Sequence, residues 1–87
     1  MSDKFRLQVF VLDRAVFSGD VISIIAPGED GYLGVLAHHA ALLTTLGEGA
    51  LTVETGEETK TFQIKGGFME VLNNQVTVLA DSILQPD

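Results

Sequence analysis

Apolar and polar residues alternate along much of this chain. Between Phe5 and Val11 every second residue is apolar, while Arg6 and Gln8 occupy positions between them. Successive side chains of a strand point to opposite faces, so this segment predicts a strand with one buried face. Residues 15–27 predict two further short strands separated by Ser18-Gly19-Asp20, because these residue types favour turns.

Two later segments have the composition of β-hairpins. Residues 50–64 place Thr55-Gly56-Glu57-Glu58 between two alternating runs, and residues 67–81 place Asn73-Asn74 between two β-rich runs. Asparagine tolerates the left-handed backbone that a tight hairpin turn needs. In total the pattern predicts about nine short strands, and therefore an all-β fold: a flattened antiparallel β-sandwich or barrel. Only Leu36–Leu46 remains for one or two helical turns.

Composition narrows the possible functions. The 87 residues predict one domain covering residues 1–87, because no linker, repeat or low-complexity segment divides them. The net charge of −7 disfavours binding to nucleic acid or anionic lipid and favours a basic protein partner. The uncharged run from Gly31 to Gly47 is shorter than the roughly 20 apolar residues of a transmembrane helix, so we expect a soluble domain.

Gly28, Gly31 and Gly34 follow an apolar strand, which invites comparison with dinucleotide-binding loops. Their spacing is G-x-x-G-x-x-G rather than G-x-G-x-x-G, and Glu29 and Asp30 would face the phosphates. We therefore expect turn glycines and no bound nucleotide.

His38 and His39 are candidate metal ligands. Neighbouring residues of an extended segment point to opposite faces, and the chain has no cysteine or third histidine to complete a site. We expect no metal and no other cofactor. One histidine should be solvated and the other packed or hydrogen-bonded.

Catalytic and carrier functions have little support. Ser18, Ser23 and Ser82 lack a G-x-S-x-G context, so no serine nucleophile is indicated and we do not expect an enzyme. A lipoyl or biotinyl carrier domain would present a lysine on a hairpin tip. Lys60 and Lys65 are instead expected within or at the end of a strand, which leaves the carrier domain as the weaker alternative.

Protein docking is the role that the residues favour. The segment from Tyr32 to Leu43 has more apolar side chains than one edge of a thin core can bury, and exposed apolar patches usually mark partner contacts. Leu33, Val35, Leu42 and Leu46 are expected in the core. The apolar side chains that the core cannot bury, which include Leu36, suggest a protein partner. A generic β-sandwich adaptor remains an alternative.

Two stretches resemble the epsilon subunit of F-type ATP synthase. APGEDGYLGVLAHHAALLTTLGEGAL carries the G-x-x-G-x-L-G turn, an H-A pair followed by L-L, and a glycine before the next strand. IKGGFMEVLNNQVTVLAD carries the G-G-F-x-E-V and V-T-V-L-A-D motifs, and FSGDV resembles an early turn of the family. The matching residues are Gly28, Gly31, Leu33, Gly34, His39, Ala40, Leu42, Leu43, Gly49, Gly66, Gly67, Phe68, Glu70, Val71 and residues 76–81.

The resemblance implies a non-catalytic β-sandwich domain of the central stalk, or rotor. Such a domain binds the gamma subunit and the membrane-embedded ring of proton-carrying subunits, so that ion-driven rotation is coupled to ATP synthesis. It implies a peripheral location on the cytoplasmic face of a bacterial inner membrane, or on the stromal side of a plastid thylakoid. The expected partner-binding residues are Glu29, Asp30, Gly31, Tyr32, His38, His39, Leu42 and Leu43.

The chain departs from the family pattern at two places. Ala41 stands where proline commonly follows the H-A pair, and Ala37-His38 stands where Pro-Gly is common, which predicts a less rigid loop. The family typically continues beyond L-A-D into a two-helix C-terminal domain that can inhibit hydrolysis and in some members binds ATP. Asp87 is the last residue of this chain, so we expect that domain and its functions to be absent.

Overall fold

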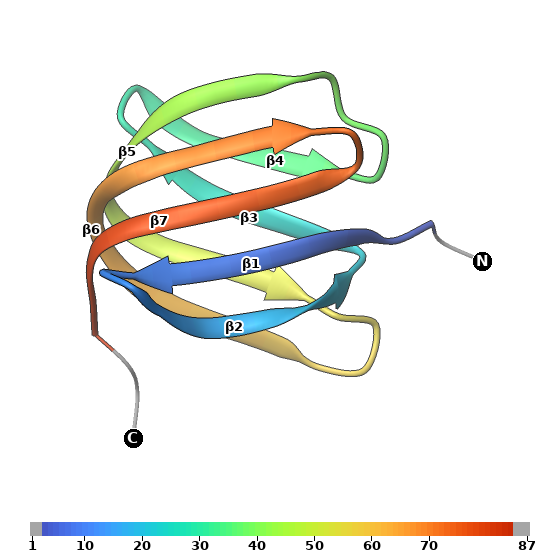
Figure 1. Cartoon of the computed structure of the whole chain (residues 1–87), viewed down its shortest axis with the longest axis horizontal. Coiled ribbons are helices and arrows are strands. Elements are labelled where there is room, and N and C mark those ends of the chain that lie inside the picture. The colour runs from blue at the N-terminus through green and yellow to red at the C-terminus, as the bar shows by residue number, and fades with distance from the viewer. Residues whose placement is uncertain (1–2, 85–87) are drawn as a thin grey trace.

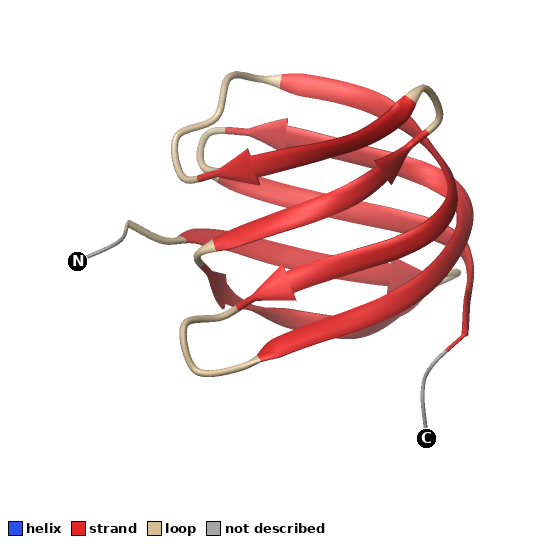
Figure 2. Cartoon of the chain, turned by 180° about the vertical axis from the view of Figure 1, so that it is seen from behind, coloured by secondary structure: helices blue, strands red, loops and turns tan. Residues whose placement is uncertain are grey.

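The computed structural model describes residues 3–84, which form seven strands and contain no helix (Figure 2). The strands are β1 (Phe5–Val11), β2 (Arg14–Val21), β3 (Ser23–Gly28), β4 (Gly31–Leu36), β5 (Leu42–Glu54), β6 (Thr59–Leu72) and β7 (Gln75–Leu84). The all-β fold class predicted from the alternation is confirmed.

The strands form one hydrogen-bonded sheet in the order β2-β1-β7-β6-β5-β3-β4. Neighbouring strands are antiparallel except β1 and β7, which are parallel. β5 and β6 are long and curved, so the sheet folds over into two facing layers (Figure 1). One layer contains β2, β1 and β7, the other contains β3 and β4, and β5 and β6 contribute to both.

Glycines permit the curvature of the two long strands. Gly66 and Gly67 of β6 have φ angles of 74° and 128°, which L side chains rarely adopt. A Cβ atom on Gly67 would collide with the carbonyl oxygen of Leu79 on β7. On β5, the regular pairing with β6 skips Gly47. The bend therefore depends on residues without side chains.

The core lies between the layers and is built from the inward faces of the strands. In β1, Phe5, Leu7 and Val9 are almost fully buried, as the alternation predicts. The rest of the core comes from the other strands: Val21, Ile24, Ala26, Val35, Leu46, Leu51, Val53, Phe62, Ile64, Met69, Val71, Val76, Val78 and Ala80. Among residues 3–84 no polar or charged side chain is buried.

The sandwich has two distinct ends (Figure 1). At the loop end lie the start of β1, the β4–β5 loop (residues 37–41), the β5–β6 turn (55–58) and the β6–β7 turn (73–74). At the bend end lie the β1–β2 turn (12–13), the β3–β4 turn (29–30) and the curved parts of β5 and β6. These two ends decide which predicted site residues can act together.

Three details of the predicted strands are wrong. About nine short strands were expected, but seven occur in the described chain, and β5 and β6 have 13 and 14 residues. Ser18-Gly19-Asp20 lies inside β2, because these residues pair regularly with β1 at the sheet edge, and the chain breaks at Ile22 instead. Leu36–Leu46 forms strand ends and a loop rather than helical turns.

Both predicted hairpin turns are confirmed. Asn73 and Asn74 connect β6 to β7 with φ angles of 52° and 60°, the left-handed conformation expected of them. Thr55–Glu58 connects β5 to β6, and the Thr55 hydroxyl accepts hydrogen bonds from the backbone N–H groups of Glu57 and Glu58. These two turns were therefore readable from the sequence, unlike the turn predicted at Ser18-Gly19-Asp20.

Candidate docking surface

The β3–β4 turn projects from the bend end of the sandwich. Glu29 and Asp30 form a two-residue turn between the paired residues Gly28 and Gly31. All four predicted residues of this segment, Glu29 to Tyr32, are exposed. The N–H group of Glu29 donates to the Thr45 carbonyl of β5, which anchors the base of the turn. The turn therefore exposes two carboxylates on a backbone that is hydrogen-bonded to β5.

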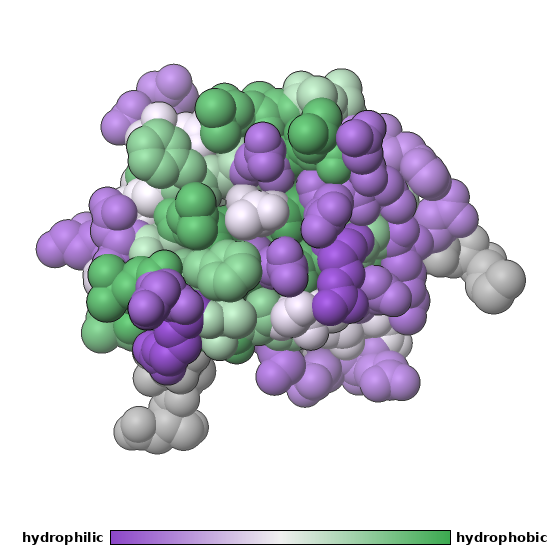
Figure 3. All heavy atoms as spheres, in the orientation of Figure 1, coloured by the Kyte–Doolittle hydropathy of each residue, from purple (hydrophilic) through white to green (hydrophobic). Residues whose placement is uncertain are grey.

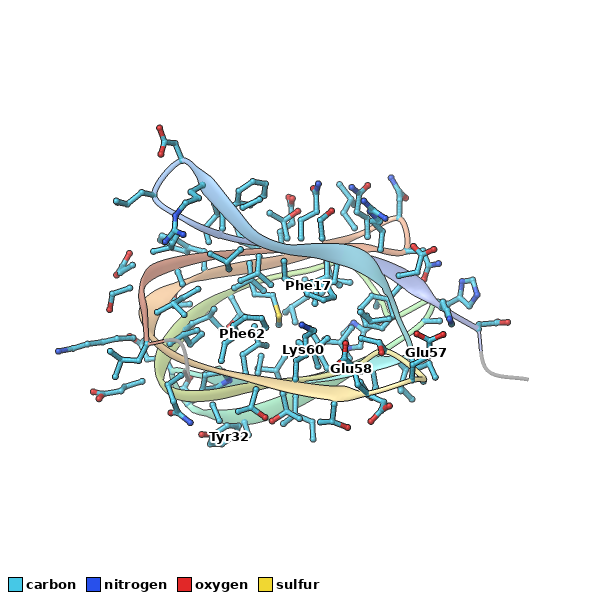
Figure 4. The ribbon with its side chains drawn as sticks, turned by 90° about the horizontal axis from the view of Figure 1, so that it is seen from below. Phe17, Tyr32, Glu57, Glu58, Lys60 and Phe62 are labelled. Atoms are coloured by element: carbon cyan, nitrogen blue, oxygen red, sulfur yellow. The ribbon has the colours of Figure 1, made fainter. Side chains whose placement is uncertain are left out.

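Tyr32 lies flat on the outside of its layer (Figure 4). Its hydroxyl accepts a hydrogen bond from the N–H group of Ala50 at 3.0 Å, at the point where the pairing between β3 and β5 is interrupted. A Cβ atom on Gly49 would collide with this hydroxyl, so glycine makes room for the ring. Tyr32 remains 61% exposed. It thus combines a structural hydrogen bond with an accessible aromatic surface.

The two histidines lie at the opposite, loop end. His38 occupies the left-handed region with φ of 65°, and its N–H group donates to the side-chain oxygen of Asn74 at 2.7 Å. Its Nε2 lies 3.1 Å from a carboxylate oxygen of Asp3. The His39 Nδ1 lies 2.7 Å from the Ala40 carbonyl, which can only accept, so Nδ1 donates.

The two histidine side chains lie in different surroundings. His38 lies in the turn that follows β4 and His39 lies directly after it, rather than in the extended segment expected from sequence, and their rings contact different partners. His38 is exposed and His39 is partly buried. Within residues 3–84 no three His, Cys, Asp or Glu side chains gather as a candidate metal site.

An apolar face covers part of the layer that contains β6 and β7. We define it by Leu43, Phe68 and Leu79, which are 71%, 54% and 48% exposed. With Glu70 and Thr77 these residues line a shallow hollow of about 320 Å³. Phe68 and Leu79 are paired across β6 and β7, and the half-buried Phe10 pairs with Leu79 from β1. Figure 3 shows hydrophobic side chains gathered over the left and upper parts of this layer.

Sequence reasoning did not identify Phe68 and Leu79 as surface residues, although a signal was present. A strand that buries one face can bury only one of two adjacent apolar side chains, because the other points to the opposite face. Phe68 precedes the buried Met69, Leu79 follows the buried Val78, and Leu43 follows the partly buried Leu42. Adjacent apolar pairs in alternating strands therefore indicate the exposed face.

The predicted partner-binding residues fall into two groups. Glu29, Asp30, Gly31 and Tyr32 lie at the bend end, whereas His38 and His39 lie at the loop end. Leu42 points inward and packs against the core, while Leu43 points outward on the apolar face. Val35 and Leu46 are buried and Leu33 is packed against the core, as expected, and Leu36 is exposed.

The other candidate residues are dispersed. Lys60 and Lys65 lie within β6, as expected. The Lys60 Nζ lies 3.9 Å from the Oε2 carboxylate oxygen of Glu58 (Figure 4). Ser18 accepts a hydrogen bond from Arg6. In the described chain neither histidine is hydrogen-bonded to a serine. No helix that could span a membrane occurs between residues 3 and 84.

Comparison with known proteins decides the family. Residues 4–86 match the model of the family described as ATP synthase, Delta/Epsilon chain, beta-sandwich domain. The chain belongs to this family. It is 49% identical over 85 residues to the ATP synthase epsilon chain of Pelotomaculum thermopropionicum, covering 94% of this chain and 62% of the relative. It is 43% identical over 82 residues to the epsilon chain of Caulobacter vibrioides, covering 94% of this chain and 95% of the relative.

Solved structures agree on the fold of this family member. A chain in the cryo-EM structure of the Euglena gracilis mitochondrial ATP synthase, OSCP/F1/c-ring, superposes with a TM-score of 0.87 at 25% identity, covering 93% of this chain and 52% of that one. A chain of the Tetrahymena thermophila central stalk/c-ring structure superposes with a TM-score of 0.80 at 17% identity, covering 97% and 68%. The chain spans about 63% of the length of the Leptospira interrogans epsilon chains that it matches.

Proposed function

We propose that this domain is a non-catalytic rotor component of an F-type ATP synthase. It would bind the gamma subunit and the membrane ring, and so help to couple ion-driven rotation to ATP synthesis. The observation that carries the proposal is the family match over residues 4–86, which spans the whole sandwich. Its location would be peripheral, on the cytoplasmic face of a bacterial inner membrane or the stromal side of a plastid thylakoid.

We assign different contacts to the β3–β4 turn and to the apolar face. The Glu29–Tyr32 turn is exposed, acidic and anchored to β5, which suits contact with polar loops of the ring. The apolar face, with Leu43 beside the histidine loop, suits the gamma subunit, because exposed apolar patches provide the buried centre of interfaces. A net charge of −7 favours basic surfaces on both partners by raising association rates and selectivity.

The proposal is tested by tagging this chain in its native organism and purifying it from detergent-solubilised membranes. Gamma and the ring subunits should co-purify in fixed proportion. Phe68→Ser combined with Leu79→Ser should reduce recovery of gamma, while Leu12→Ser, an exposed leucine in the β1–β2 turn, serves as the matched control. Recovery of the tagged chain without gamma or ring would refute the rotor assignment.

The carrier-domain alternative has a direct test as well. Lys60 and Lys65 lie within β6 rather than on a hairpin tip, which disfavours enzymatic modification. The intact mass of the native protein should therefore equal the mass calculated from the sequence. A lipoyl or biotinyl adduct on either lysine would support the carrier function instead.

A further inference from the structure

The two edge strands of the sheet are protected to different degrees. β2 carries Arg14 and Asp20, and its pairing with β1 is shifted by an irregularity beside Val9 and Phe10. Charges and bulges of this kind prevent an edge from pairing with another chain. β4 pairs with β3 without a register shift at all six positions and contains no charged residue and no proline. Its edge therefore lacks these protections.

The free edge of β4 offers backbone hydrogen-bonding groups. The two-residue turn closes the β3–β4 hairpin at Gly28 and Gly31, and a closing pair of this type exchanges backbone hydrogen bonds. Since bonded and non-bonded pairs alternate, Tyr32, Gly34 and Leu36 direct their N–H and C=O groups away from β3. The Leu36 carbonyl accepts from the His39 N–H group at 3.2 Å. In the described chain no second strand pairs with β4.

Two exposed apolar side chains flank a glycine on the outer face of this edge strand. Tyr32 and Leu36 are both more than half exposed, and Gly34 lies between them. A Cβ atom on Gly34 would meet only the Ile24 carbonyl, at 3.9 Å. Ile25, which is paired with Gly34 from β3, is 49% exposed. A large apolar side chain placed opposite Gly34 by an added strand could lean across the glycine and contact Ile25.

We propose that β4 binds an extended segment of a partner protein by strand addition. Such a segment forms backbone hydrogen bonds with the edge and places apolar side chains at alternate positions. It is uncharged along β4 and basic at the end that lies beside Glu29 and Asp30, because these two carboxylates are exposed there. A second copy of this chain is disfavoured as the occupant, since each copy carries a net charge of −7. This inference does not require the rotor assignment, although both use the Glu29–Asp30 turn.

The test uses the isolated chain and the capped peptide Val-Thr-Phe-Thr-Val-Lys-Lys. Bound antiparallel, this peptide places its phenylalanine near Gly34 and its lysines near the acidic turn. Titration followed by amide NMR should give a Kd between about 10 μM and 1 mM. The largest shifts, and slowed hydrogen exchange, should occur at Tyr32, Gly34 and Leu36.

Three controls distinguish strand addition from nonspecific binding of the peptide. N-methylation of the peptide at the amides that face β4 should abolish binding, because the backbone donors are lost. Gly34→Pro removes an edge donor and should weaken binding by about tenfold or more, whereas Gly34→Ala keeps the N–H group and should change it by less than about fivefold. Replacing both Glu29 and Asp30 by amides should weaken binding mainly at low salt.

Three results would overturn the proposal. The first is the absence of any spectral change at about 1 mM peptide, the weak limit of the expected affinity. The second is a set of shifts centred on the apolar face instead of β4. The third is self-association of the chain alone that is removed by Gly34→Pro, which would identify a second copy as the occupant.

Discussion

The side-chain oxygen of Asn74 accepts a hydrogen bond from the backbone N–H group of His38, 36 residues away in the chain. The side-chain NH₂ group of Asn74 also donates to the Lys4 carbonyl at 3.0 Å. The backbone carbonyl of Asn74 accepts a hydrogen bond from the Arg6 N–H group. One asparagine therefore joins the β6–β7 turn, the β4–β5 loop and the start of β1. This clamp anchors the loop that contains His38 to the rest of the sandwich.

Removing the Asn74 side chain should loosen the histidine loop. Asn74→Gly keeps the left-handed turn but removes both side-chain hydrogen bonds, so we expect a loss of about 1 kcal/mol in the free energy of unfolding. Hydrogen exchange at His38 should accelerate at the same time. Asn73→Gly is the matched control, because Asn73 has the same backbone region and, within residues 3–84, no side-chain hydrogen bond. Equal effects of the two variants would show that the clamp is unimportant.

The curvature of β6 should depend on Gly67. Gly67→Ala forces a side chain into an unfavourable backbone region and against the Leu79 carbonyl, so it should destabilise the domain by about 2–4 kcal/mol. Chemical unfolding monitored by circular dichroism measures this loss. Gly34→Ala, where a Cβ atom has open space, should change stability by less than about 1 kcal/mol. A tolerated Gly67→Ala would mean that the bend can form without glycine.

Stability should fall in acid partly through Glu54. The Thr59 hydroxyl and the Gly56 N–H group donate to its two carboxylate oxygens and lower its pKa below the ordinary value. Because the folded-state pKa is depressed, this stabilisation is present above the unfolded-state pKa and disappears as pH falls through the folded-state pKa. Glu54→Gln should therefore lower the melting temperature at pH 7 and have a smaller effect at pH 3. A larger effect in acid would contradict the assigned direction of the pKa shift.

Tyr32 should contribute to docking through its ring rather than its hydroxyl. Interface energy often concentrates in a few aromatic contacts, each contributing about 2 kcal/mol, so Tyr32→Ala should weaken binding to the ring by tens of fold. Tyr32→Phe loses only the hydrogen bond to Ala50 and should bind normally, although its melting temperature should fall slightly. Quantitative co-purification together with thermal unfolding measures both effects. Equal binding losses in both variants would assign the tyrosine a purely structural role.

His39 tests the loop end separately. His39→Asp removes a donor from the Ala40 carbonyl and adds negative charge to the loop that leads into Leu43, so recovery of gamma should decrease. Glu57→Lys, in the exposed β5–β6 turn at the same end, is the control and should leave recovery unchanged (Figure 4). If Glu57→Lys disrupts assembly while His39→Asp and Tyr32→Ala are silent, the docking surface lies elsewhere.

The sequence by itself determined the all-β class, the inward faces of the strands and the two hairpin turns, but not the number or the ends of the strands. Alternation identifies which residues of β1 are buried, and Asn73-Asn74 specifies its turn, because both are local consequences of backbone geometry. The family motifs also lie in continuous segments, so the family resemblance needs no knowledge of distant contacts.

Only the tertiary structure decided how these pieces combine. The bend at Gly66-Gly67 lets two long strands serve both layers, which is why nine expected strands became seven. The same folding places Tyr32 and His39 at opposite ends of the sandwich, although only six residues separate them in the chain. It also brings Leu43, Phe68 and Leu79 together on one face. Strand pairing over long sequence separations sets these positions, and period-2 alternation carries no information about which strand becomes whose neighbour.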